Sequence, residues 1–307
     1  MKSIALIFPG QGAQKVGMGR EFYDAVPEAR EVFEKANAVL GEDLTKIIFE
    51  GPEDRLMATA YCQPAIFTMS MAALEAFRAS DKFREVSVKF TAGLSLGEYG
   101  ALCAAGVLSF EDTLRLIQKR GALMEQAAKA RPGKMAAVIG FDKDKLVEIC
   151  AEAGCEVANF NAPDQIVITG EEAPVSKACQ KITEAGGKKV IPLDVAGAFH
   201  SSLMKPAADL FRGALEGVPL KVTDIKVVTN VNARPQETPE EIRQNLPLQI
   251  HSSVQWVDSI RFLASQGITD LVEIGPGRVL KGLIRKIDPA LSVHNIQIPE
   301  DLQALPF

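Results

Sequence analysis

The sequence lacks the features that mark several large classes of protein. Its 307 residues contain 34 lysines and arginines against 39 aspartates and glutamates, so the formal net charge is −5. Such a chain has no general attraction for nucleic acid or for an anionic membrane surface, and we expect neither as a partner. No stretch approaches the run of about 20 apolar residues that a membrane-spanning helix needs. The short apolar run before Pro9 does not match a signal peptide either.

Cysteine is also scarce. The five cysteines are odd in number and include no C-x-x-C pair, which argues against a disulfide framework and against a zinc site. We therefore expect no metal and a location in the reducing cytoplasm. What is present is ordinary for a globular chain, with 47% hydrophobic and 24% charged residues. The length allows a large core in one or two domains.

A G-x-S-x-G pentapeptide at residues 93–97 lies between an extended apolar run (86–92) and a helical run (98–105). Strand, tight turn, serine and helix is the order that holds a nucleophilic hydroxyl on a strained bend. The glycines permit the bend, and the N–H groups that open the helix face any oxygen that becomes negative beside the serine. We interpret Ser95 as a nucleophile and the Leu96 N–H as an oxyanion donor. The alternative is an ordinary glycine-rich turn with a helix-capping serine.

Strands and helices alternate over most of the chain, which predicts an α/β fold with a parallel sheet. The predicted strands of the main part are residues 3–8, 86–92, 225–231 and 270–274. The predicted helices of this part are residues 27–40, 63–77, 98–105, 207–215 and 253–266, with further helix starts at Ser109 and Thr238.

Shorter units begin at residue 134 and continue to residue 194. They are, in order, a strand (135–139), a helix (143–153), two strands of a hairpin (156–159 and 165–169), a helix (174–185) and a strand (189–194). The order βαββαβ is typical of a ferredoxin-like module. We predict a core of residues 1–130 and 198–307 with a ferredoxin-like α+β subdomain inserted at 131–197. The cleft between the two is the expected ligand site.

Arg120 stands out on the helix that begins at Ser109. The spacing of 100° per residue places it in the middle of an arc of apolar residues, which are Leu116, Ile117, Leu123, Met124 and Ala127. A buried guanidinium without an anion is costly. It could form an internal salt bridge or could hold a substrate carboxylate in a bidentate contact. The sequence pattern leaves both interpretations open.

A serine nucleophile needs a general base, and the chain has three histidines. His251 falls in a predicted polar loop and His294 near the C-terminal tail. His200 lies where the inserted segment returns to the core, at the lip of the expected cleft, and we select it as the base. His294 is the rival if the protein is a hydrolase with the chain order Ser…Asp…His. No acid is evident as an orienting partner, so a backbone carbonyl or amide could hold the imidazole tautomer.

With these residues placed, the chain closely resembles the malonyl-CoA:acyl carrier protein transacylases of bacterial-type fatty acid synthesis. The matching stretches occur in the same order from end to end and are FPGQGAQ (8–14), QPA (63–65), GLSLGEY (93–99), QKRG (118–121), FHS (199–201), VQW (254–256) and EIGPG (273–277). The commonest nucleophile motif of the family has a histidine where this chain has Leu94. The serine, both glycines and Glu98 remain.

The resemblance implies an α/β-hydrolase-like core and a role for each matching position. Ser95 would be acylated, and His200 would act as acid and base with its ring oriented by the Gln249 carbonyl. The backbone amides of Gln11 and Leu96 would hold the oxyanion, and Arg120 would bind the malonyl carboxylate. The substrate-binding set also includes Met124 and Phe199, and a phenylalanine before the histidine accompanies malonyl rather than methylmalonyl selection in related acyltransferases.

The resemblance further implies that the substrates are malonyl-CoA and holo-acyl carrier protein, with no cofactor and with a monomeric enzyme. Because the carrier protein is generally acidic, we expect a local basic rim on this chain. Its candidate residues are Lys188, Lys189, Lys205, Lys281, Arg285 and Lys286. Three alternatives remain: a malonyltransferase of a polyketide-type pathway, a serine thioesterase or hydrolase, and a non-catalytic module that binds a carrier.

Overall fold

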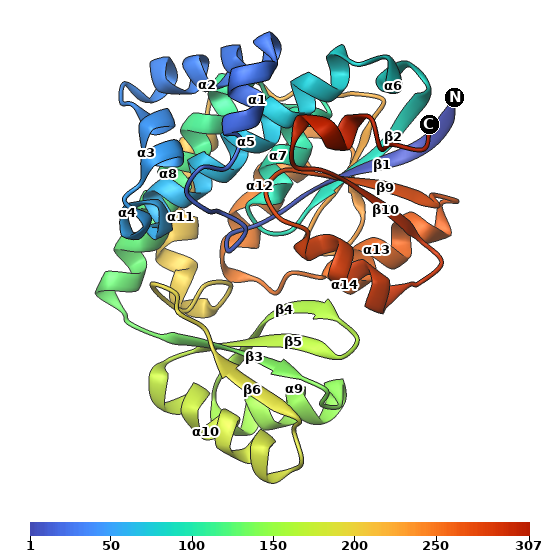
Figure 1. Cartoon of the computed structure of the whole chain (residues 1–307). Coiled ribbons are helices and arrows are strands. Elements are labelled where there is room, and N and C mark those ends of the chain that lie inside the picture. The colour runs from blue at the N-terminus through green and yellow to red at the C-terminus, as the bar shows by residue number, and fades with distance from the viewer.

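The computed structural model describes residues 1–307 and contains two separate sheets (Figure 1). The larger sheet consists of six strands: β1 (Lys2–Phe8), β2 (Val86–Gly93), β7 (Lys226–Val228), β8 (Pro235–Gln236), β9 (Asp270–Ile274) and β10 (Ser292–Ile296). Their order is β10-β9-β1-β2-β7-β8, and every pair is parallel except β7 with β8. The carboxyl ends of the parallel strands therefore lie at the same end of the sheet, where α/β proteins place their ligands.

The helices of this part are α1 (Arg20–Ala25), α2 (Pro27–Leu40), α3 (Leu44–Glu50), α4 (Glu53–Met57), α5 (Thr59–Ala79), α6 (Asp81–Arg84), α7 (Gly97–Ala104), α8 (Phe110–Ala130), α11 (Lys205–Leu215), α12 (Pro239–His251), α13 (Trp256–Ser265) and α14 (Val279–Ile287). Short 3-10 turns occur at Ser202–Met204 and Pro299–Leu302. None of the helices is long and apolar enough to cross a membrane.

Helices cover both faces of the larger sheet, and alternate residues of its central strand pack against them. Ile4 and Leu6 of β1 belong to the core formed with α2, α5, α7 and α8. Ala5 and Ile7 point the other way, into a second core that contains Trp256 of α13 and residues of α14. Strands buried on both faces read as continuous apolar runs rather than as alternating ones, which is why residues 3–8 could be identified as a buried strand.

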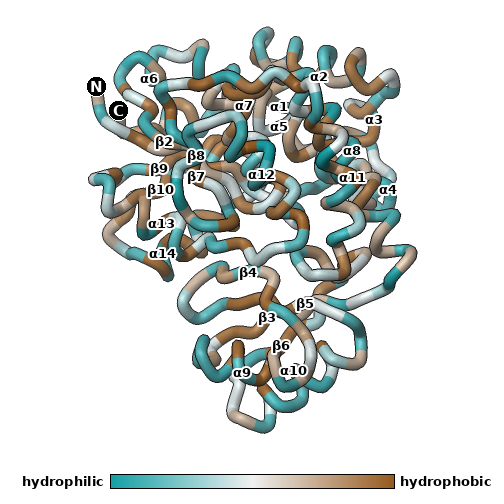
Figure 2. Tube along the Cα trace, turned by 180° about the vertical axis from the view of Figure 1, so that it is seen from behind, coloured by the Kyte–Doolittle hydropathy of each residue, from teal (hydrophilic) through white to brown (hydrophobic).

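Residues 134–192, the inserted segment, form the second sheet. Its elements are β3 (Lys134–Ile139), α9 (Lys143–Ala153), β4 (Glu156–Ala162), β5 (Gln165–Gly170), α10 (Glu172–Glu184) and β6 (Lys189–Pro192). The strand order is β4-β5-β3-β6 with antiparallel neighbours. In Figure 1, α9 and α10 lie on the face of this sheet that points away from the larger part. A separate apolar core fills the space between them and the strands, and β3 and β5 are hydrophobic in Figure 2. The predicted order βαββαβ is confirmed.

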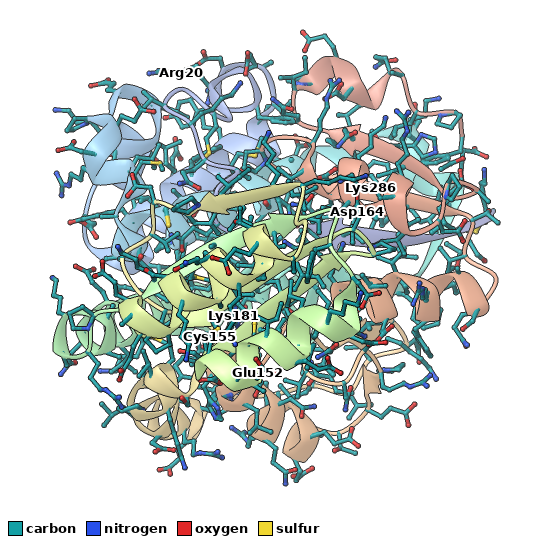
Figure 3. All side chains as sticks on the ribbon, turned by 90° about the horizontal axis from the view of Figure 1, so that it is seen from below. Arg20, Glu152, Cys155, Asp164, Lys181 and Lys286 are labelled. Atoms are coloured by element: carbon teal, nitrogen blue, oxygen red, sulfur yellow. The ribbon has the colours of Figure 1, made fainter.

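Backbone hydrogen bonds and an ion pair attach the inserted segment to the larger part. Val254, just before α13, exchanges backbone hydrogen bonds with β4: its N–H donates to Ala158 O at 2.8 Å, and Phe160 N–H donates to Val254 O at 3.0 Å. Lys286 of α14 forms an ion pair of 3.2 Å with Asp164 in the turn between β4 and β5. Within the segment, Lys181 of α10 reaches Glu152 of α9 at 2.6 Å (Figure 3). The contacts with Val254 and Lys286 thereby hold β4 beside the carboxyl ends of the parallel strands.

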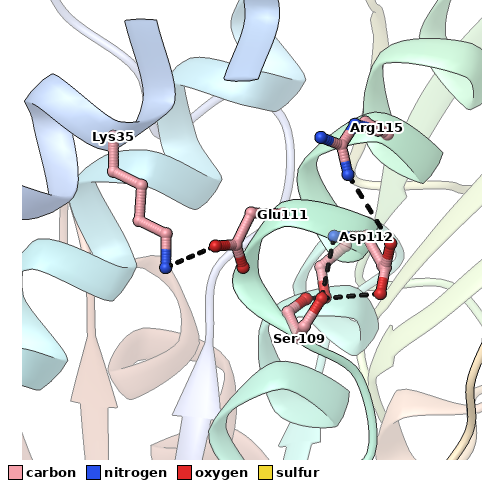
Figure 4. Close-up of polar contacts among 6 residues, drawn as sticks. Lys35, Ser109, Glu111, Asp112 and Arg115 are labelled. Atoms are coloured by element: carbon pink, nitrogen blue, oxygen red, sulfur yellow. Dashed lines mark hydrogen bonds and ion pairs between the residues drawn. The ribbon is translucent and has the colours of Figure 1, made fainter. Parts of the chain in front are cut away.

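The helix that carries Arg120 begins where the sequence predicts. Ser109 precedes α8, and its Oγ accepts a hydrogen bond of 3.0 Å from the Asp112 N–H (Figure 4). Lys35 of α2 pairs with Glu111 in the first turn at 2.7 Å. The cap satisfies a free N–H group, and acids in the first turn interact favourably with the helix dipole.

Several predicted boundaries need correction. α5 begins at Thr59, not at residue 63, so Pro64 lies inside the helix; its surroundings are fully buried, and packing outweighs the one backbone hydrogen bond that proline cannot make. α13 begins at Trp256 instead of residue 253, because residues 253–254 are used in contacts with β4. The strand predicted at 225–231 is shorter, and His251 ends α12 instead of lying in a loop.

Candidate active site

Ser95 sits on the bend between β2 and α7 with a φ of 53°. A left-handed conformation is unusual for a non-glycine residue and occurs where the surroundings enforce it. The flanking glycines are required by space: a Cβ on Gly93 would lie 2.0 Å from the Gly97 carbonyl carbon, and one on Gly97 would lie 2.1 Å from the Phe8 carbonyl oxygen. The bend thus presses β2, α7 and the end of β1 together, and the serine side chain projects from it.

Asn230, just beyond β7, holds this bend from the side. Its Oδ1 accepts a hydrogen bond of 2.6 Å from the Ser95 N–H, and its Nδ2 donates one of 2.7 Å to the Gly93 carbonyl. Local sequence patterns do not single out Asn230. The only feature of the sequence that points to Asn230 is its place as a polar residue near the carboxyl end of a predicted strand. Groups that face the ligand of a parallel sheet lie at that end.

His200 faces Ser95. Its Nε2 is 2.8 Å from Ser95 Oγ, and its Nδ1 is 2.8 Å from the Gln249 carbonyl oxygen and 3.2 Å from that of Ser252. Because carbonyl oxygens only accept, Nδ1 carries the proton and Nε2 is free to accept one from the serine hydroxyl. Backbone carbonyls therefore orient the imidazole, as expected, and no carboxylate contacts the ring.

The imidazole is held in its neutral form. Burial, followed by the positive charge of Arg120, lowers the pKa of His200 to about 4. The two backbone carbonyls act in the opposite direction but do not offset the burial. A histidine with this pKa is unprotonated, and so able to act as a base, throughout the neutral range.

Arg120 is 1% exposed and has no carboxylate partner. Its NH1 donates to Gln63 Oε1 at 2.8 Å, and its NH2 donates to Ser95 Oγ and to Gln249 Oε1, both at 3.0 Å. The internal salt bridge that the sequence left open is thus absent. A buried guanidinium with only neutral acceptors can exchange one of them for an anion.

A cavity of about 180 Å³ opens beside these three side chains. Strands β3, β4 and β5 of the smaller sheet form one side of it, and helices and loops of the larger part form the other. The lining residues include the predicted Gln11, Leu96, Met124 and Phe199, together with Leu94, Met135, Asn159, Asn161, Val167, Leu193 and Val195. Gln249 lies behind Arg120 and reaches the site through its hydrogen bonds. Ser95, His200 and Arg120, which are far apart in the sequence, therefore converge on the cavity between the two parts of the chain.

The other two histidines lie elsewhere. His294 of β10 is 3.0 Å from Asp270 Oδ1, a late Asp–His pair that local sequence patterns do not predict. Asp270 opens β9, at the amino end of the parallel strands, whereas Ser95 follows the carboxyl end of β2. This pair therefore lies at the amino end of the parallel strands, opposite to the end at which Ser95 lies. No group of three His, Cys, Asp or Glu side chains is arranged to hold a metal ion.

Comparison with known proteins agrees with this geometry. Residues 5–294 match the model of the acyl transferase domain family. The malonyl CoA-acyl carrier protein transacylase of Bacillus subtilis is 42% identical over 99% of this chain and 96% of that relative. The chain belongs to the malonyl-CoA:acyl carrier protein transacylase family. The enzyme of that name from Staphylococcus aureus is 41% identical over 99% of this chain and 98% of its own length.

Solved structures of transacylases share the fold. An acyl-carrier-protein S-malonyltransferase from Bartonella henselae superimposes with a TM-score of 0.94 at 39% identity, covering 99% of this chain and 98% of that one. A malonyl-transacylase solved in complex with its type II polyketide-synthase acyl carrier protein gives a TM-score of 0.94 at 37% identity, with the same coverage. The mixed α/β architecture with a parallel sheet is thus the architecture of the family.

The lowered pKa of His200 predicts how the reactivity of Ser95 depends on pH. The rate of Ser95 modification by a fluorophosphonate, followed by intact mass, should stay nearly constant from pH 7 to pH 5. With an unperturbed histidine, whose pKa is about 6.5, the rate would fall roughly 25-fold in the same interval. Circular dichroism at each pH serves as the control for folding, and a fall of that size in folded protein would contradict the prediction.

Proposed function

We propose that the protein transfers the malonyl group from malonyl-CoA to the phosphopantetheine thiol of acyl carrier protein through a malonyl-serine intermediate. Ser95 is the nucleophile and His200 is the acid and base of a Ser-His dyad. The observation that carries the proposal is the placement of Arg120, a buried cation without an anionic partner, within hydrogen-bond distance of the Ser95 hydroxyl. Family membership supports the same reaction.

In the first half-reaction, Ser95 Oγ attacks the thioester carbonyl while its proton passes to His200 Nε2. The backbone N–H groups of Gln11 and Leu96 hold the tetrahedral oxyanion, and loss of one such donor typically costs about 10²–10³ in rate. The intermediate collapses with cleavage of the C–S bond. The CoA sulfur leaves with the proton from His200, and the malonyl group stays on Ser95 as an ester.

In the second half-reaction, the phosphopantetheine thiol attacks the ester. His200 accepts the thiol proton and returns it to Ser95 Oγ as the C–O bond breaks. The solved complex of a malonyl-transacylase with its carrier protein supports acyl carrier protein as the acceptor here. That complex belongs to a polyketide system, and service to such a pathway instead of fatty acid synthesis is the alternative assignment, with the same chemistry.

Arg120 selects the acyl group. The malonyl carboxylate takes the place of neutral acceptors on the guanidinium, and an acetyl group would leave that charge unpaired. Met124 and Phe199 pack beside the acyl chain from the cavity wall, consistent with their position in the lining. Leu94, which replaces the usual histidine of the family motif, adds apolar surface to the same wall.

The proposed assembly has an α/β-hydrolase-like core, residues 1–130 and 198–307, and a ferredoxin-like subdomain, residues 131–197, acting as a cytoplasmic monomer without a cofactor. The separate sheet and apolar core of the inserted segment support this division. The odd number of cysteines supports the location.

Substitution of the arginine tests the selectivity. Arg120→Ala should lower kcat/KM for malonyl-CoA by roughly 10²-fold, because a charge-assisted contact to the carboxylate is lost, and should affect acetyl-CoA far less. The measurement is acyl-serine formation from each donor in the same assay. Arg115→Ala, an exposed arginine of the same helix, is the matched control. Equal losses for both donors would exclude the carboxylate contact.

Intact mass spectrometry separates the transferase from a serine thioesterase. After incubation with malonyl-CoA alone, the chain should retain one malonyl group, and holo-acyl carrier protein should remove it and gain the same mass. Ser95→Ala should gain no malonyl group. Release of free malonate at the same rate with and without carrier protein would assign the protein as a hydrolase.

Charge reversal tests the docking surface. The six predicted basic residues are exposed, although Lys286 pairs with Asp164. Lys281→Glu and Arg285→Glu on α14, which lies beside β4 in Figure 1, should raise the KM for acyl carrier protein several-fold and leave the KM for malonyl-CoA unchanged. Arg84→Glu on α6, at the far end of the molecule, is the control. An unchanged carrier KM would reject α14 as part of the docking surface.

A further inference from the structure

Glu98, in the first turn of α7, is a fully buried carboxylate that the proposed reaction does not use. Its Oε2 accepts hydrogen bonds from the Asn230 N–H at 3.0 Å and from Gln249 Nε2 at 2.8 Å, and its Oε1 lies 3.4 Å from Gln236 Nε2. No lysine, arginine or histidine contacts it. Burial raises the pKa of Glu98, whereas the hydrogen bonds with Gln249, Asn230 and Thr229 and the positive charge of Arg120 favour its ionised form.

Glu98 and Arg120 are two buried, oppositely charged groups at the centre of the molecule, and neither has a direct charged partner. One side chain joins them. The amide of Gln249 accepts from Arg120 NH2 through Oε1 at 3.0 Å and donates to Glu98 through Nε2 at 2.8 Å. The same Nε2 donates to the Ser95 carbonyl at 2.9 Å. The three residues form a cation–amide–carboxylate chain.

The chemistry of the carboxylate fixes the direction of this chain. An ionised carboxylate only accepts, so the NH₂ end of the Gln249 amide must face Glu98, and its oxygen must face Arg120. The amide keeps the two charges close enough to attract each other in a medium of low polarity. A direct Glu98–Arg120 contact would instead occupy the guanidinium N–H groups that face the cavity.

We propose that Glu98 is the counter-charge of Arg120, coupled to it through the Gln249 side-chain amide, and that it sets how tightly the site holds a carboxylate. Its role is that of a positioning residue, since it acts through Gln249 and does not reach the cavity. The effect on carboxylate affinity rests on the proposed function of Arg120. The charge coupling itself does not, because both groups are present without substrate.

A double-mutant cycle on thermal unfolding tests the coupling without any substrate. Glu98→Gln keeps an acceptor oxygen for Asn230 and Gln249 but leaves Arg120 without its counter-charge. Arg120→Gln removes the positive charge and leaves Glu98 without its counter-charge. Each single variant should lower the Tm by roughly 10 °C, as expected for one half of a buried charge pair. The Tm of the double variant should fall by no more than half of the sum of the two single Tm losses.

A double variant that folds when either single one does not also supports the coupling. Additive losses overturn the proposal, because a carboxylate that only satisfies neighbouring N–H groups has no reason to interact with Arg120. Failure of both Glu98→Gln and the double variant to fold overturns it too, since Glu98 would then be needed irrespective of the arginine charge.

The matched control is Glu273→Gln. Glu273 is equally buried and accepts from the N–H groups of Leu280 and Lys281 at the start of α14, with no bridge to Arg120. Combined with Arg120→Gln, it should give additive losses.

Binding of free malonate gives a second readout that a structural role would not produce. Folded Glu98→Gln should bind malonate roughly tenfold more tightly than the unchanged protein in isothermal titration calorimetry, because removal of a nearby negative charge strengthens the attraction for an anion. Unchanged or weaker binding overturns the role in carboxylate affinity. If no variant binds malonate but the double-mutant cycle shows coupling between Glu98 and Arg120, the proposed role of Arg120 in carboxylate binding is wrong.

Discussion

The structure depends on the burial of one guanidinium beside one hydroxyl. Arg120 lies in the core with no anion in contact, and burial shields nearly all of its surface from the water that would compensate its charge. Neutral oxygens from Gln63, Gln249 and Ser95 accept from its two terminal nitrogens, whereas its Nε has no partner, and these oxygens come from α5, α12 and the bend after β2. Three separate elements must therefore be in place before the charge is tolerated, which ties the fold of the large part to the geometry of the site.

The bend at Ser95 imposes the second constraint. Its left-handed backbone is held by hydrogen bonds to both sides of Leu94 from Asn230, and by glycines whose missing side chains let α7 pack on the end of β1. His200 also has a positive φ, 56°, and hydrogen bonds to two carbonyls fix its ring. Both side chains of the proposed dyad thus stand on strained backbone that the surrounding packing enforces, so the proposed proton transfer between them needs little reorganisation.

Local patterns in the sequence predicted much of this arrangement. The apolar run of residues 3–8, the capping serine of α8 and the G-x-S-x-G bend each depend on neighbours within a few residues, and each is confirmed. The burial of Arg120 followed from its place in an apolar arc. The contacts of Gln249 and Asn230 could not be predicted from such patterns, because they depend on how α12 and β7 pack against α7. The same limit explains the late Asp270–His294 pair, whose distance from the nucleophile is set by strand register and not by chain order.

The charges at the site also bear on each other during the proposed reaction. Arg120 helps to lower the pKa of His200, so in the empty site the imidazole is a weak base that stays unprotonated. A malonyl carboxylate bound to the guanidinium offsets that positive charge, and the imidazole then becomes easier to protonate. Proton transfer from Ser95 is therefore favoured when the acyl group carries a carboxylate and not when it lacks one. In the proposed mechanism, selection of the substrate and activation of Ser95 are in this way two effects of a single buried charge.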